Sequence, residues 1–128
     1  MAFTELQKTN ILLPDTTIRF VCISDTHNAR PSIPPGDVLI HAGDLTKGGT
    51  IDELLAAVDW IGSLAHPIKI VVAGNHDKAL DAKYRASELL DAPNVDWNSL
   101  GIIYLEHAAT EITVRGRTLT VFGSPYTP

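Results

Sequence analysis

The chain has 128 residues, of which 45% are hydrophobic and 20% are charged, and this composition excludes a disordered or fibrous protein. Its length suits one globular domain, residues 1–128, that buries a core of its own. The net charge is −5 and the Lys and Arg residues are scattered, so we expect no duplex nucleic acid as a partner.

The N-terminal residues and the single cysteine indicate the compartment. The first seventeen residues lack the basic start and apolar run of a secretion signal. No stretch approaches the ~20 apolar residues that cross a bilayer, so we expect no membrane partner. Cys22 has no second cysteine for an intrachain disulfide, and we interpret it as a small core residue. These features predict a cytoplasmic protein.

Three short apolar runs predict the strands of a sheet. They cover residues 18–24, 37–42 and 68–73, and each ends at glycine or at polar side chains. Runs of this kind are typical of strands that are covered on both faces.

Between Thr50 and Ala65 the apolar residues recur at steps of three and four, which predicts a helix that buries one stripe. The stripe consists of Leu54, Leu55, Val58, Ile61 and Leu64. Thr50 followed by Glu53 matches a capping box, and Pro67 prevents the helix from continuing. Strand, helix and strand in this order predict a right-handed βαβ unit and a parallel sheet.

The second half of the chain predicts an antiparallel continuation. Residues 79–90 are expected to be helical, residues 102–105 form a short strand, and residues 111–122 alternate like a β-hairpin around an Arg-Gly pair. Trp60 and Trp97 are interpreted as packing residues.

Polar motifs follow the three parallel strands, namely SDTH, HAGD and AGNHD. They contribute carboxylates from Asp25 and Asp44, the imidazole of His27 and the amide oxygen of Asn75, which are ligands for divalent cations. Because the carboxyl ends of parallel strands share one edge, we expect these side chains to meet there. Taken singly, each Asp also fits a turn or helix cap and each His a hydrogen-bonded loop residue.

The order of the motifs resembles that of the calcineurin-like metallophosphoesterases, which is D-x-H, then G-D, then G-N-H-D/E. The phrases RFVCISDTH, GDVLIHAGDLT and KIVVAGNHD resemble the small branch related to brain metallophosphoesterase-domain proteins, over roughly residues 18–128. The resemblance implies an α/β fold in which a sheet sandwich is flanked by helices. It also implies hydrolysis of phosphate esters, most readily phosphodiesters.

The resemblance assigns roles residue by residue. Asp25 and His27 would bind a first metal, Asp44 would bridge two metals, and Asn75 would bind the second. His76 would be the catalytic residue that stabilises or protonates the leaving oxygen. The implied cofactors are two divalent ions, with Mn, Fe or Zn all compatible, and a water between them would have a pKa low enough to attack phosphorus.

Other polar residues near the motifs are interpreted as supporting groups. Asp77 is expected to orient loop groups rather than bind metal. His41 is expected to be a hydrogen-bonded residue behind the ligands. His66 is expected to face solvent at a helix end, and His107 follows a strand from which it could approach the site.

Two differences from the family pattern change which substrate and which metal occupancy we expect. Residues 45–48 read LTKG rather than the Asp-Arg-Gly of the protein-phosphatase branch, which favours small diesters or nucleotides over phosphoproteins as substrates. In that family a lone His and a G-H-x-H motif follow later in the chain, and nothing after Asp77 matches either of them. We therefore expect a truncated N-terminal portion in which the second metal is weakly held.

Two alternatives remain open at this point. The chain could be a catalytically weak module that binds a metal or a nucleotide, because the C-terminal His ligands are absent. It could also act as a partner subunit, since uncovered sheet edges favour a homodimer or a domain-swapped assembly.

Overall fold

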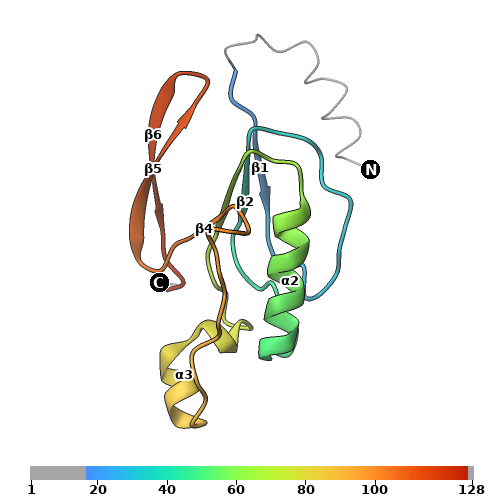
Figure 1. Cartoon of the computed structure of the whole chain (residues 1–128), viewed down its shortest axis with the longest axis vertical. Helices are drawn as coiled ribbons and strands as arrows, with labels where there is room; N and C mark the ends of the chain where they lie inside the picture. The colour runs from blue at the N-terminus through green and yellow to red at the C-terminus, as the bar shows by residue number, and fades with distance from the viewer. Residues whose placement is uncertain (1–16, 127–128) are drawn as a thin grey trace.

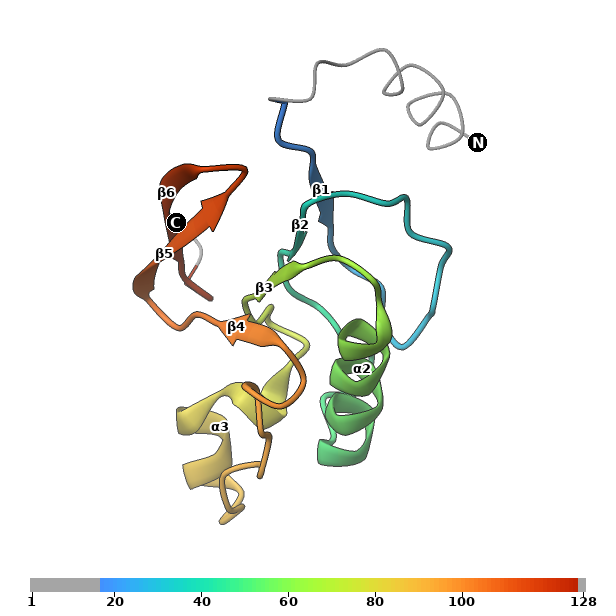
Figure 2. The same ribbon diagram turned by 45° about the horizontal axis from the view of Figure 1, so that its top comes forward.

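The computed structural model describes residues 17–126. Its centre is a four-stranded sheet in the order β1-β2-β3-β4, with all neighbouring strands parallel. The strands are β1 (Phe20–Ile23), β2 (Val38–His41), β3 (Ile68–Val71) and β4 (Ile102–Tyr104). Figures 1 and 2 show a helix on one side of this sheet and a β-hairpin on the other. The mixed α/β class and the parallel pairing of β1 to β3 confirm the prediction. The strand β4 was expected in the antiparallel continuation, but it pairs in parallel with β3, so only β5 and β6 are antiparallel.

The helix α2 (Ile51–Ser63) begins at the predicted capping box. The Glu53 N–H donates to the Thr50 hydroxyl at 3.2 Å, and the Thr50 N–H donates to the Glu53 carboxylate at 2.9 Å. Two N–H groups that lack partners within the helix are thereby satisfied. The predicted start of the helix is confirmed.

The buried stripe of α2 packs on one face of the sheet. Its buried residues are Leu54, Ala57, Val58 and Ile61. They join a core with Val21, Leu39 and Val71 from the first three strands. Burying a side chain of this size contributes about 1.5–3 kcal/mol, so this contact fixes the helix against the sheet.

The hairpin consists of β5 (Ala108–Val114) and β6 (Arg117–Gly123), which pair in antiparallel fashion. Arg115 and Gly116 form its two-residue turn, with φ of 50° and 76°. Positive φ at both positions is the geometry of the turn that matches the twist of a hairpin. The inner face of the hairpin buries Ile112 and Val114 against the sheet, in a second core with Val38, Ile70 and Leu105. The predicted hairpin is confirmed.

The first strand is covered on one face only, which contradicts the prediction of two covered faces. Phe20 is 40% exposed and Cys22 is exposed, whereas Val21 is buried against α2. The prediction of Cys22 as a core residue is therefore wrong. The physical reason is that the hairpin packs on the neighbouring strands, and among residues 17–126 nothing covers the outer face of β1 at these two positions.

The helix predicted over residues 79–90 is divided into a short 3₁₀ helix, η1 (Lys78–Leu80), and α3 (Ala82–Ser87). Asp81 separates them, because its carboxylate accepts backbone N–H groups in the first turn of α3 at 2.9 and 3.4 Å. Leu89 has a φ of 54°, a conformation incompatible with continuing the helix. Within the described part of the chain, no helix is both long enough and apolar enough to span a membrane.

Three residues at the far end of α2 show how the loops pack. His66 is 6% exposed, and its Nε2 donates to the Pro34 carbonyl at 2.8 Å. The prediction that it faces solvent is wrong, because the loop between β1 and β2 folds over it. Trp60 and Trp97 both pack against the core on the α2 side, which confirms their packing role.

Candidate metal centre

The loops that follow β1 and β2 are bonded to each other at the carboxyl edge of the sheet. The Asp25 N–H donates to the Gly43 carbonyl at 2.9 Å, and the His27 N–H donates to the Asp44 carbonyl at 3.1 Å. These bonds extend the parallel pairing beyond the ends of the strands. The first two motifs therefore lie side by side, as the sequence predicted.

The third motif joins them through Asp44. The Asp44 Oδ1 accepts the backbone N–H of His76 at 2.9 Å, which ties the loop after β3 to the loop after β2. One oxygen of this carboxylate is thereby engaged with the protein.

Four residues at this edge have backbone conformations that residues other than glycine rarely adopt. Asp25, His27, Asn28 and Asp44 have φ of 56°, 46°, 72° and 58°. Left-handed conformations are uncommon for residues other than glycine, and they persist where surrounding contacts enforce them. The inter-loop hydrogen bonds supply that constraint here, and they hold three predicted metal ligands in fixed orientations.

Three side chains form a cluster with the donor atoms of a metal site. His27, Asp44 and His76 each offer one ligand atom, and these atoms all lie within 4.8 Å of one another. His27 and Asp44 are predicted ligands, whereas His76 is the predicted catalytic residue. The rings of His27 and His76 meet edge to face, with centroids 4.8 Å apart.

Hydrogen bonds fix which nitrogen of each histidine is available. The Nδ1 of His27 lies 3.2 Å from the Thr46 carbonyl, and the Nδ1 of His76 lies 2.9 Å from the Lys47 carbonyl. A carbonyl oxygen only accepts, so each neutral ring carries its proton on Nδ1 and keeps a lone pair on Nε2. Metal-binding histidines are held in this way by the nitrogen that does not bind. The donor set therefore fits a divalent cation.

Asp25 flanks this cluster at the surface. Its Oδ1 lies 3.6 Å from the Nε2 of His27, and its side chain is 62% exposed. The pKa of Asp25 lies below its ordinary value, chiefly because the Ser24 side chain hydrogen-bonds to it, with smaller contributions from Asp44 and His27. The carboxylate is therefore ionised at neutral pH, as a metal ligand requires.

Asn75 is exposed and lies between Gly74 and His76 in the loop after β3. Its side chain lines a cavity of about 380 Å³ that Tyr126 also borders. Asn75 is therefore the neighbour in the chain of His76, which belongs to the cluster, and its side chain is exposed to solvent.

Two glycines allow the loops to approach this closely. A Cβ atom on Gly74 would collide with the Asp44 carboxylate and with its backbone N. Gly43 has a φ of 105°, and a Cβ there would lie 2.7 Å from the Gly74 N. Any side chain at either position would push the second and third loops apart.

Asp77 is buried, with 2% of its surface exposed, and it hydrogen-bonds to the loops that carry the cluster. Its carboxylate accepts the N–H groups of Leu45, Thr46 and Gly74 at 3.1, 2.9 and 2.9 Å. The Thr46 hydroxyl also donates to it at 2.8 Å. The prediction that Asp77 orients loop groups is confirmed.

His41 supports the same loops from inside the sheet. It is fully buried, its Nδ1 accepts the Gly43 N–H at 3.2 Å, and its Nε2 donates to the Thr26 hydroxyl at 2.8 Å. Burial lowers the pKa of His41 to about 4, against the opposing effect of nearby carboxylates. The ring is therefore neutral at pH 7, and the predicted hydrogen-bonded role is confirmed.

Glu53 has a role at this edge that the sequence did not reveal. Besides capping α2, its carboxylate accepts the Asn28 side-chain amide at 2.7 Å and the Gly48 N–H at 2.8 Å. These bonds lower the pKa of Glu53 to about 2, with the Asn28 bond contributing most. The capping box predicted the local contact, but nothing in the spacing indicated that Glu53 also reaches the loop after β1.

His107 lies away from the cluster, at the start of the hairpin. Its Nδ1 is 3.2 Å from the Ser124 hydroxyl, and its ring contacts Phe122 and Tyr126 with centroids 5.2 and 5.6 Å apart. In this structure it forms part of an exposed aromatic group on the hairpin and does not reach the cluster.

Comparison with known proteins assigns the family. The model of the calcineurin-like phosphoesterase family matches residues 18–127, which is most of the chain. The chain belongs to this family. The resemblance drawn from the three motifs is thereby confirmed.

Three similar curated proteins are much longer than this chain. Metallophosphoesterase domain-containing protein 1 of Homo sapiens is 38% identical over 132 residues, which cover 90% of this chain and 39% of that protein. Probable rhamnogalacturonate lyase C of Emericella nidulans is 49% identical over 115 residues, 89% of this chain and 11% of that protein. A UPF0046 protein of Caenorhabditis elegans is 49% identical over 78 residues, 58% of this chain and 28% of that protein. The chain spans well under half of each.

Proposed function

We propose that this edge of the sheet is the metal-binding part of a phosphoesterase site that cleaves phosphodiester bonds in small diesters or nucleotides. The observation that supports the proposal is the cluster of His27, Asp44 and His76, whose ligand atoms lie within 4.8 Å of one another. Two divalent cations, when bound, would draw charge from the phosphate oxygens and lower the pKa of an attacking water.

Four side chains at this edge would supply the ligand atoms of such a site. His27 presents Nε2 because Nδ1 is bonded to Thr46, and Asp44 presents the oxygen that His76 does not occupy. Asp25 adds a second carboxylate beside His27, and Asn75 adds an amide oxygen on the opposite loop. These oxygen and nitrogen donors suit Mn, Fe or Zn, and together they would hold two neighbouring cations that share Asp44.

His76 is proposed to act on the leaving oxygen. Its Nδ1 donates to the Lys47 carbonyl, so the ring is held with Nε2 toward the cluster. Protonation at Nε2 would create a donor for the departing oxygen. A proton on Nε2 excludes metal binding by the same atom, so His76 would act on the leaving oxygen only while it does not bind a metal.

The experiment is a measurement of bis-p-nitrophenyl phosphate hydrolysis by the full chain with and without added Mn²⁺. We expect metal-dependent turnover that Asp44→Asn and Asn75→Ala each reduce by about 100-fold, the effect typical of disturbing a metal site. Asp59→Asn is the matched control, because Asp59 is an exposed carboxylate on α2 outside the cluster. Unchanged activity in Asp44→Asn would refute the proposal.

A folded, Mn²⁺-loaded chain without turnover would also count against catalysis by this chain. Tight nucleotide binding in that sample, measured by titration calorimetry, would favour the alternative of a binding module at the same edge.

A further inference from the structure

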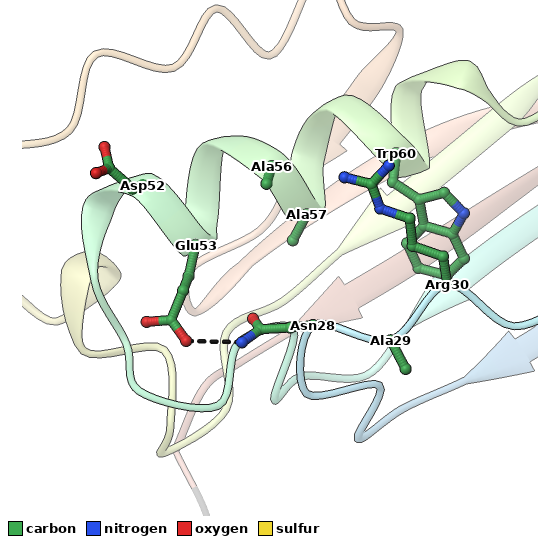
Figure 3. A pocket seen from close by; sticks show the side chains of 8 residues that line it. All are labelled: Asn28, Ala29, Arg30, Asp52, Glu53, Ala56, Ala57 and Trp60. Atoms are coloured by element: carbon green, nitrogen blue, oxygen red, sulfur yellow. Dashed lines mark hydrogen bonds between the residues drawn. The ribbon is translucent and has the colours of Figure 1, made fainter.

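A groove runs between α2 and the loop that follows β1, and it is lined by Asn28, the residue after His27 of the cluster. Its volume is about 350 Å³, within the range of about 300–1,000 Å³ usual for small-molecule sites. Figure 3 shows Asn28 and Glu53, joined by a hydrogen bond, at one end, and Arg30 and Trp60 at the other. Between residues 53 and 60 the helix rises by about 10 Å, which sets the length of the groove.

The Asn28 end of the groove is built from the same loops as the cluster. Asn28 directly follows His27 in the chain, and consecutive Cα atoms lie about 3.8 Å apart. Its Oδ1 accepts the Lys47 N–H at 3.3 Å, and the Lys47 carbonyl accepts the Nδ1–H of His76 at 2.9 Å. The Asn28 end of the groove is therefore linked to His27 through the chain and to His76 through Lys47.

The other end offers two flat groups. Trp60 is half-buried and presents an indole, and Arg30 is exposed. Within residues 17–126, Arg30 forms neither a hydrogen bond nor an ion pair. The small side chains of Ala56 and Ala57 lie on the helix between the two ends and leave room above it. An indole and an unpaired guanidinium together favour a planar aromatic ring, by stacking and by cation–π attraction.

The charges favour an uncharged ring here and the phosphate at the cluster. Asp52 and Glu53 border the groove, so its acidic residues outnumber its one cation, Arg30. The Glu53 carboxylate is already engaged by Asn28, Gly48 and Thr50. A phosphate in the groove would face these carboxylates, whereas a neutral base would not.

We propose that this groove is a subsite for the planar aromatic group of a phosphate ester, such as a nucleobase, whose phosphate lies at the cluster. This proposal rests on the proposed function of the cluster. The metals would recognise the phosphate, and the groove would recognise the aromatic part of the same substrate. The proposal assigns Trp60 and Arg30 to substrate binding.

Tryptophan fluorescence tests the subsite directly, because the chain has two tryptophans. Trp97→Phe leaves Trp60 as the reporter, and Trp60→Phe leaves Trp97, which is stacked on Tyr104. Each variant, loaded with Mn²⁺, is titrated with AMP and with ribose 5-phosphate. We expect saturable quenching of Trp60 by AMP, no quenching of Trp60 by ribose 5-phosphate, and no response of Trp97 to either.

A second variant tests the role of the cation. Arg30→Gln is expected to weaken AMP binding about two- to fivefold and to leave ribose 5-phosphate binding unchanged, since cation–π attraction at an exposed site is worth about this factor. Arg117→Gln, an exposed arginine on β6, is the matched control. Equal effects of Arg30→Gln on both ligands, or quenching of Trp60 by both, would overturn the subsite.

Calorimetry with inorganic phosphate separates the two proposals. Phosphate binding to the Mn²⁺-loaded chain without AMP-specific quenching of Trp60 would overturn the subsite and leave the metal site standing. AMP-specific quenching of Trp60 without binding of Mn²⁺ or phosphate would support the groove and refute the phosphoesterase proposal.

Discussion

The carboxyl edge of the parallel sheet and the turn of the β5–β6 hairpin use the same backbone conformation for different reasons. Asp25, His27 and Asp44 have positive φ at the edge, and Arg115 and Gly116 have positive φ at the turn. A Cβ on Gly116 would meet no atom within 4 Å, so its conformation is a local property of a tight turn. At the edge, hydrogen bonds between loops and close backbone contacts enforce the geometry, so it depends on distant residues.

The largest expected difference between the two regions comes from removing the Asp77 carboxylate. Asp77→Ala leaves three buried or partly buried N–H groups without their acceptor, and we expect a loss of about 4 kcal/mol in the free energy of unfolding. Glu111→Ala, on the exposed face of β5, should change it by less than about 0.5 kcal/mol. Urea unfolding measures both. Similar losses in the two variants would remove the distinction between the regions.

A methyl group on each glycine tests the close approach of the loops. Gly74→Ala should cost about 3 kcal/mol and weaken Mn²⁺ binding, because its Cβ collides with Asp44. Gly116→Ala should cost about 1 kcal/mol from its positive φ alone and leave Mn²⁺ binding unchanged. The comparison is made by urea unfolding and metal titration. If Gly74→Ala proved the milder substitution, the contact between the second and third loops would be wrong.

Lowering the pH should weaken the edge through His41. Its folded pKa of about 4 lies below the ordinary value of 6.5, so its contribution to stability is complete above pH 6.5 and declines as the pH falls toward about 4. Between pH 8 and pH 5 this single group should cost about 2 kcal/mol. His41→Gln should flatten the pH dependence of unfolding over this interval, and His107→Gln should not. An unchanged slope in His41→Gln would contradict a neutral, buried ring.

The smallest effect is expected where the hairpin turn meets the sheet. An Nη atom of Arg115 lies 3.4 Å from the Asp37 carboxylate at the start of β2, and the arginine side chain is 46% exposed. Arg115→Ala should therefore cost less than about 1 kcal/mol, and the cost should shrink in high salt. Unfolding at low and high ionic strength measures this. A large, salt-independent loss would show that the turn is held by something other than charge.

The stabilisation from the contact between Asp37 and Arg115 should also depend on pH, because the pKa of Asp37 is shifted. This pKa lies below its ordinary value of 3.8, chiefly because the carboxylate accepts the Arg19 N–H, with a further contribution from Arg115. The stabilisation is therefore present above pH 3.8 and is lost as the pH falls below it.

Local patterns predicted the elements whose signals lie in neighbouring residues. The capping box of Thr50 and Glu53 marked the start of α2, and the Arg-Gly pair marked the hairpin turn. The prediction was less successful where distant segments decide the surroundings. Cys22 is exposed because of where the hairpin packs, and His66 is buried because a loop from earlier in the chain covers it.

For the site, the motifs predicted which loops would meet, because the carboxyl ends of parallel strands must share an edge. They placed His76 at this edge beside the metals, as a catalytic residue. They did not predict it as a possible ligand with His27 and Asp44, since this depends on the bond between its N–H and Asp44. The sequence also did not predict the hydrogen bond between Glu53 and Asn28, because this bond forms only when α2 packs against the loop after β1.

The sequence by itself determined the first three strands, the helix cap, the ligand-bearing motifs and the family, because each depends on residues close together in the chain. Only the tertiary structure decided which nitrogen of each histidine is free, where the loops are strained, and which side chains border the groove. These properties arise from hydrogen bonds and packing between segments far apart in the chain, and no local pattern encodes them.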